Sequence, residues 1–130
     1  MKKGKRGFTM IELMIVLIIV AILLALAYPS YVQYVRKSKR GEAQQLLMNW
    51  SINQEIWRSN NPLYADTDDI PAPTHDHYDF EVGDLSATAY TLSATAKGGN
   101  DQENDTAKDG TPCALTLNQN GEKSPAVCWN

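Results

Sequence analysis

The chain has 130 residues and a formal net charge of −3, which leaves room for one domain and gives no strong overall excess of either charge. The charges are unevenly placed, because residues 41–130 carry four basic and fourteen acidic side chains, a net charge of −10. This acidic region argues against a general nucleic-acid-binding protein, which needs a basic surface.

An apolar segment follows a short basic start. Four basic residues lie within residues 2–6, and residues 13–35 contain no formally charged side chain. A run of that length exceeds the roughly 20 residues that a membrane-spanning helix needs. The basic start favours a cytoplasmic N-terminus, but four further basic residues at 36–40 weigh equally against it, so charge alone leaves the orientation open.

A secretory signal peptide and an ordinary membrane anchor are the simpler interpretations of this segment. The signal peptide fits poorly, because the apolar run is long and the helical pattern continues past Tyr34 without a small-residue cleavage site. The ordinary anchor accounts for the hydropathy, but it gives no reason for Gly7-Phe8-Thr9 or for Glu12 at the start of the run.

The stretch KGKRGFTMIELMIVLIIVAILLALAYPSY resembles the amino-terminal signature of type IV prepilins. The shared features are a basic leader ending in Gly7, then Phe8-Thr9, two apolar residues, Glu12, and an apolar helix with Pro29 near its end. The resemblance implies that a prepilin peptidase cuts after Gly7 and methylates the new amine of Phe8. Because the leader carries four basic residues, the mature chain would have a net charge near −7.

The resemblance also implies an order of segments and a location. Residues 1–7 are the cytoplasmic leader, and residues 8–35 cross the inner membrane once before assembly and lie in the filament core afterwards. Residues 36–130 are the headgroup, periplasmic at first and then part of the extracellular pilus.

Under this interpretation Glu12 and Pro29 have roles in assembly. We expect Glu12 to pair with the Phe8 ammonium of a neighbouring subunit, since an unpaired charge among apolar helices is costly. The alternative is a carboxylate that reaches the membrane interface near a helix end. Pro29 removes one backbone hydrogen bond and predicts a kink, and by resemblance to assembled pilins the turns before it also unwind.

Beyond the membrane segment, helical spacing of mostly apolar residues predicts that the helix continues to about Ser59 and stops at Asn61-Pro62. The tryptophans of this stretch are expected in the core. The residues that set the pattern are Ala43, Leu46, Leu47, Trp50, Gln54 and Trp57.

Residues 60–77 are rich in Pro, Asp and Asn, a composition that predicts an irregular connection. His75-Asp76-His77 raises a metal hypothesis, but ligands at i and i+2 reach one ion only from an extended strand, and no third ligand has a recognisable spacing. Solvated loop residues are therefore the preferred interpretation.

Three strands are predicted at residues 78–82, 90–96 and 114–118, and Asn120-Gly121 predicts a hairpin that folds the third strand back towards residues 126–129. Residues 98–110 form an acidic loop that suggests calcium. However, Thr106 stands where an EF-hand loop needs glycine and no glutamate closes the loop, which favours a solvated loop.

Two cysteines in an exported chain, Cys113 and Cys128, have one possible intramolecular pairing. This pairing looks like the disulfide-bounded loop of type IVa pilins. The ending CALTLNQNGEKSPAVCWN is similar to that of PilE-type minor pilins, although one residue rather than two separates Cys113 from Leu-Thr-Leu. The implied fold is α+β, one long N-terminal helix packed on an antiparallel sheet of about four strands.

The function implied is assembly, as a minor pilin that serves pilus biogenesis, twitching motility or adhesion. Its implied partners are other pilins, the prepilin peptidase and the inner-membrane assembly machinery. A major pilin and a DNA-uptake pilin remain as alternatives, and DNA binding is not expected unless Lys97, Lys108 and Lys123 converge on one face. No positioned nucleophile, phosphate loop or metal-ligand spacing indicates an enzyme, and no cofactor is expected.

Overall fold

The computed structural model describes residues 7–129, in two compact units of which the first ends at Tyr34 and the second begins at Val35. We call residues 35–129 the head unit. The predicted leader lies outside the described residues except for Gly7.

One long helix, α1, spans Met10–Arg58. Its outer end is closed by side chains, because Ser59 Oγ donates to the carbonyl of Ile56 (2.7 Å) and Asn61 Nδ2 donates to that of Trp57 (2.9 Å). These bonds satisfy carbonyl groups that a helix leaves without partners at its C-terminus. The predicted end at about Ser59 is therefore confirmed to within one residue.

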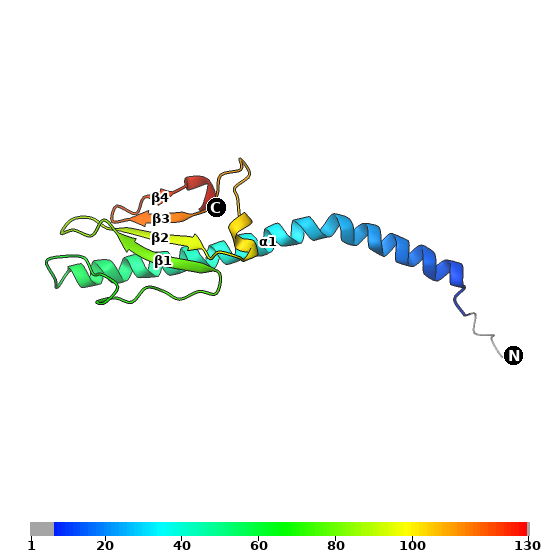
Figure 1. Ribbon diagram of the computed structural model, residues 1–130, viewed down its shortest axis with the longest axis horizontal. Coiled ribbons are helices and arrows are strands. Elements are labelled where there is room, and N and C mark those ends of the chain that lie inside the picture. The colour runs from blue at the N-terminus through cyan, green and yellow to red at the C-terminus, as the bar shows by residue number, and fades with distance from the viewer. Residues whose placement is uncertain (1–6, 130) are drawn as a thin grey trace. The chain divides into compact units, whose positions relative to one another are not determined.

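The head unit carries one antiparallel sheet, in which four strands lie in the order β1-β2-β3-β4 (Figure 1). The prediction of one long helix with a four-stranded antiparallel sheet is confirmed, with strand ends that differ by one residue. The strands are β1 Tyr78–Gly83, β2 Thr91–Ala96, β3 Leu115–Asn118 and β4 Lys123–Ser124.

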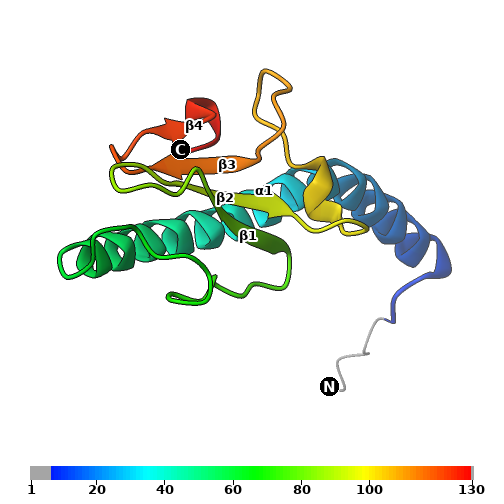
Figure 2. The ribbon, with the colours of Figure 1, turned by 60° about the vertical axis from the view of Figure 1, so that its left-hand side comes forward.

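The core of the head unit lies between one face of this sheet and the part of α1 that runs along it (Figure 2). Trp50 and Leu47 of α1 are buried there against alternate residues of the strands. Successive side chains of a strand point to opposite faces of the sheet, so every second one faces the helix. Trp50 is thus a core residue as predicted, whereas Trp57 is half-buried. The inward residues of the strands are Tyr78, Phe80, Leu92, Ala94, Leu115 and Leu117.

The predicted partner of β3 was wrong. β4 is Lys123–Ser124, and residues 126–128 form a short 3-10 helix, η2 (Ala126–Cys128), rather than a strand. Asn118 closes the turn early, because its N–H donates to the carbonyl of Glu122 (3.2 Å). Pro125 then has no N–H to offer the ladder, so the pairing stops after two residues.

The acidic loop is also less solvated than predicted. It contains a second 3-10 helix, η1 (Asp101–Asn104), and the side chains of Gln102 and Asp105 are buried. Two arginines of α1 reach this loop, which explains how acidic residues come to be covered there.

Candidate functional site

The expected cleavage point lies in irregular chain just before α1. A Cβ added at Gly7 would meet no atom within 4 Å, and the Phe8 side chain is 76% exposed. The folded chain therefore leaves this peptide bond open to an enzyme, and any requirement for glycine would come from the peptidase.

Thr9 and Glu12 form a reciprocal cap at the start of α1. The Glu12 N–H donates to Thr9 Oγ1 (3.3 Å), and the Thr9 N–H donates to Glu12 Oε2 (3.4 Å). This is a capping box, which satisfies two N–H groups that a helix otherwise leaves unpaired. The sequence reasoning missed this role, although Thr-x-x-Glu before an apolar run is a recognised signal for it.

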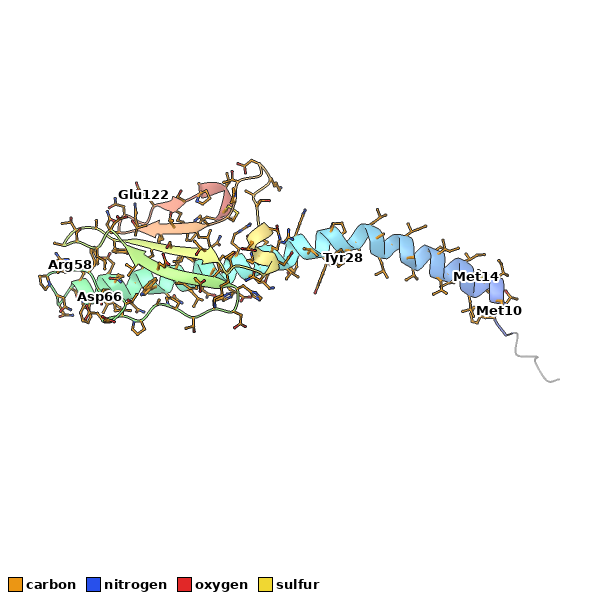
Figure 3. All side chains as sticks on the ribbon, in the orientation of Figure 1. Met10, Met14, Tyr28, Arg58, Asp66 and Glu122 are labelled. Carbon is orange, nitrogen blue, oxygen red and sulfur yellow. A yellow bond between two sulfur atoms is a disulfide. The ribbon has the colours of Figure 1, made fainter. Side chains whose placement is uncertain are left out.

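The apolar part of α1 is uncovered. An 18-residue window within the helix has a mean hydropathy of 3.1 with none of it buried, so the helix is long and apolar enough to cross a membrane. Figure 3 shows the Met10, Met14 and Tyr28 side chains projecting from it. Pro29 lies inside α1 as predicted.

Cys113 and Cys128 are bonded, with an S–S distance of 2.02 Å. The same face of α1 holds both ends of the bridge, because Arg40 Nη1 lies 3.3 Å from Cys113 Sγ and Gln44 Nε2 donates to the carbonyl of Cys128 (2.7 Å). The bridge therefore attaches the C-terminal segment to the start of β3 and to the helix together.

Arg40 also forms the buried ion pair of the head unit. Its Nη1 lies 2.7 Å and 2.8 Å from the two carboxylate oxygens of Asp105, and both side chains are less than a tenth exposed. Gln102 Nε2 donates to Asp105 Oδ2 (3.2 Å) and to the hydroxyl of Tyr78 (2.8 Å). Burial first, and then the Asp105 carboxylate, raise the pKa of Tyr78 to about 12.

One helical turn before Arg40, Arg36 forms a second ion pair with the same loop, in a more exposed position. Its Nη2 and Nε donate to the two carboxylate oxygens of Asp101 (2.6 Å and 2.8 Å), and this hydrogen bonding lowers the pKa of Asp101. Sequence reasoning treated residues 36–40 as one basic group. The i, i+4 spacing of Arg36 and Arg40 is the signal that these two share a helix face, but nothing local identified their acidic partners.

The expectation that His75-Asp76-His77 are solvated loop residues is wrong for His75, whose side chain is 11% exposed and has partners within the head unit. His75 Nε2 lies 3.1 Å from Glu42 Oε2, and His75 Nδ1 accepts the N–H of His77 (3.1 Å). Both ring nitrogens of His75 are thereby engaged. Over residues 7–129, no group of three or more His, Cys, Asp or Glu side chains could hold a metal ion.

The lysines proposed as a local basic patch do not all converge. Lys123 pairs with Leu117, which faces Leu92 in β2, whereas Lys97 follows the opposite end of β2. Five residues of strand separate these positions, about 16 Å at 3.3 Å per residue. Lys97 Nζ donates to the carbonyl of His75 (2.8 Å), and Lys123 Nζ lies over the Trp129 ring.

Two sequence families match the chain. A family described as type IV minor pilin ComP, DNA uptake sequence receptor, matches residues 29–117, and the prokaryotic N-terminal methylation motif matches residues 2–28. The second match covers the basic start, the Gly7-Phe8 bond and the apolar run as far as Tyr28.

Individual proteins match mainly over about half of the chain. The type IV major pilin protein PilE1 of Neisseria gonorrhoeae is 40% identical over 65 residues, which are 45% of this chain and 30% of that protein. The fimbrial protein EcpC of Eikenella corrodens is 50% identical over 68 residues, 47% of this chain and 44% of that protein. The matched regions thus span less than half the length of these relatives.

Among solved structures, a type IV pilin from Shewanella oneidensis has a similar fold. The TM-score is 0.55 at 23% identity, over 73% of this chain and 98% of that one. At this identity the likeness concerns the arrangement of helix and sheet.

Proposed function

Because the chain belongs to the family described as type IV minor pilin ComP, DNA uptake sequence receptor, we propose that it is a minor structural subunit of a type IV pilus. The pilin family and fold are those of structural proteins. The observation that carries the proposal is an uncovered apolar helix that begins three residues after Gly7. Such a surface needs lipid or other apolar helices around it.

In the proposed sequence of events, the peptidase cuts after Gly7 and methylates the Phe8 amine. Residues 8–35 hold the chain in the inner membrane as a single span with a cytoplasmic N-terminus. The assembly machinery then transfers the chain to an extracellular fibre, where the helix packs against those of other pilins. Pro29 lacks the N–H that would bond the carbonyl one turn earlier, so the helix can unwind there in the fibre.

Glu12 has two separable roles under this proposal. Its carboxylate caps α1 together with Thr9, and its charge would neutralise the Phe8 ammonium of a neighbouring subunit during docking. Glutamine retains the cap, since a capping box accepts either Glu or Gln, but it removes the charge.

The test compares three variants of the full chain in pilus-forming cells. Thr9→Ala should lose the cap and still enter pili, whereas Glu12→Gln and Glu12→Ala should remain in the membrane at normal levels and be depleted in sheared pili. Membrane and sheared fractions are compared by immunoblot. Normal incorporation of Glu12→Gln would refute the counter-charge role, and absence of the wild-type chain from pili would refute the pilus assignment.

A major pilin is the nearest alternative, because PilE1 is named as one. The amount of this chain relative to other pilins in sheared fibres separates the two assignments. A minor subunit should be a small fraction of the total.

A DNA-uptake pilin is a second candidate, favoured by the description of the matching family. A duplex receptor must neutralise phosphates, and its binding falls steeply with salt. The net charge of −10 over residues 41–130 and the separation of Lys97 from Lys123 disfavour this role. We expect full-length protein in detergent micelles to give no duplex-DNA mobility shift near physiological salt. Salt-sensitive, sequence-selective binding, with normal pili in a deletion strain, would reverse the order.

A further inference from the structure

An apolar-walled pocket opens at the end of the head unit where α1 stops. Its volume is about 380 Å³, and it lies between the segment that follows the helix and the loop between β1 and β2. Trp57, Leu63 and Leu85 line it, and the last two remain 56% and 39% exposed. Figure 3 shows Arg58 and Asp66 at this end of the head unit.

Two carboxylates, Asp66 and Asp69, also line this pocket, and the remaining lining residues are Asn61, Pro62, Tyr64 and Ser86. Both side chains are exposed, and neither forms an ion pair with any residue between 7 and 129. The nearby Arg58 does not neutralise them, since its guanidinium donates to the carbonyls of Ala87 (2.9 Å) and Asn61 (2.8 Å).

This combination suits one kind of occupant. A lysine or arginine has an apolar stem that packs on aliphatic and aromatic side chains and a terminal cation that a carboxylate attracts. The Trp57 ring adds a surface that favours a cation. An anionic ligand would meet two carboxylates, and a wholly apolar one would leave both without a counter-charge, since the bonds of Asp66 Oδ1 within the described residues are to the backbone N–H groups of Asp68 (2.8 Å) and Asp69 (3.1 Å).

The opposite end of the head unit carries a cation of this kind. Arg36 and Arg40 are held by Asp101 and Asp105, but Lys37 is exposed and forms no ion pair within the described part of the chain. Twenty residues of continuous helix separate Lys37 from Trp57, about 30 Å at 1.5 Å per residue. Lys37 therefore cannot reach the pocket of its own chain.

We infer that the pocket lined by Trp57, Leu63, Leu85, Asp66 and Asp69 receives the Lys37 side chain of a second copy of this chain. A donor and an acceptor at opposite ends of one body make a heterologous contact, which extends as an open helix when its rotation does not close. The inference rests on the proposed function, because it requires two copies stacked in one fibre. The contact requires two copies of the chain to lie next to each other in the fibre. It does not require the chain to be a large fraction of the fibre.

Zero-length cross-linking tests the contact in pili sheared from cells with the unmodified chain. A carbodiimide joins a lysine amine to a carboxylate with loss of water and adds no spacer. We expect a species of twice the chain mass whose digest contains Lys37 joined to Asp66 or Asp69. The distance within one chain means that this bond can form only between copies. Lys37→Arg should abolish the cross-link and leave incorporation unchanged, because the cation is retained.

Charge reversal tests the same contact without a reagent. Lys37→Glu and Asp69→Lys should each lower incorporation by up to about fivefold, as expected for an exposed ion pair, and the double variant should restore it. Lys108→Glu, at another exposed lysine, serves as the matched control and should have no effect.

Pili that contain the wild-type chain but give no such cross-link, with normal incorporation of Lys37→Glu, would overturn the inference and leave the pilus assignment intact. A cross-link from the pocket to a different pilin alone would also overturn it. Absence of the chain from pili would instead remove the proposed function on which it rests.

Discussion

Removal of Arg40 should be the most damaging single polar substitution in the head unit. Arg40 supplies the positive partner of Asp105 in a site where both side chains are less than a tenth exposed. In Arg40→Ala the Asp105 carboxylate would stay buried and keep the Gln102 amide as its side-chain donor among the described residues. We expect the free energy of unfolding to fall by about 3–5 kcal/mol, the usual cost of breaking a buried ion pair from one side.

The size of this effect depends on the charge left behind and not on the attraction that is lost. The double variant Arg40→Met with Asp105→Leu removes both charges and keeps apolar volume, so it should cost much less than Arg40→Ala alone. Arg36→Ala, one turn earlier, is the exposed counterpart, because Asp101 remains in water when its partner is removed. Its effect should be far smaller than that of Arg40→Ala.

Thermal unfolding of the full-length protein in detergent micelles, followed by near-ultraviolet circular dichroism with the disulfide intact, measures these differences. Trp50 and Tyr78 lie in the core and report on head-unit packing. A loss of less than about 1 kcal/mol in Arg40→Ala, or a double variant less stable than Arg40→Ala, would show that the buried Asp105 charge is not the main cost.

Three further predictions concern processing, the disulfide and alkaline pH. Intact-mass analysis of the membrane form should show loss of residues 1–7 and gain of one methyl group on Phe8, and a chain that still begins at Met1 would contradict this. The folded chain should show no titratable thiol, and reduction of Cys113–Cys128 should lower the melting midpoint, because a 15-residue loop contributes about 3 kcal/mol in the chain-entropy model. The pKa of Tyr78 is raised to about 12 in the folded chain, whereas an unfolded tyrosine ionises near pH 10. The contribution of Tyr78 to the free energy of unfolding is therefore complete below pH 10 and should be lost as the pH rises to 12. Tyr78→Phe should reduce this loss in unfolding curves measured across that range.

The helix and the strands could be predicted because their signals are local. The aliphatic run, the spacing from Ala43 to Gln54 and the stop at Asn61-Pro62 together placed α1 to within one or two residues. Alternation placed β2 and β3 nearly as well. The prediction placed the partner of β3 at residues 126–129 instead of Lys123–Ser124, because a two-residue strand has almost no sequence pattern. The effect of Pro125 also depends on which residues the turn brings opposite each other.

The residues of the candidate site could likewise be identified where their signals are local. Gly7, Phe8, Glu12, Pro29 and the cysteines were recognisable because each belongs to a short pattern of fixed spacing. Their chemical roles in processing and assembly stay predictions. The cap between Thr9 and Glu12 was present in the sequence as well, and it was passed over in favour of a partner in another subunit.

Hydropathy, charge and cysteine count are enough to specify the apolar helix, the acidic head and the pairing available to two cysteines, because these properties need no knowledge of contacts. Tertiary structure alone separates the four basic residues after the apolar run into two held arginines, Arg36 and Arg40, an exposed Lys37 and a half-buried Lys39. It also decided that an acidic loop is partly buried and that an apolar pocket with two carboxylates forms at the far end of the head unit. Burial and ion pairing depend on residues about 65 positions apart in the chain, and no local pattern specifies which of them meet.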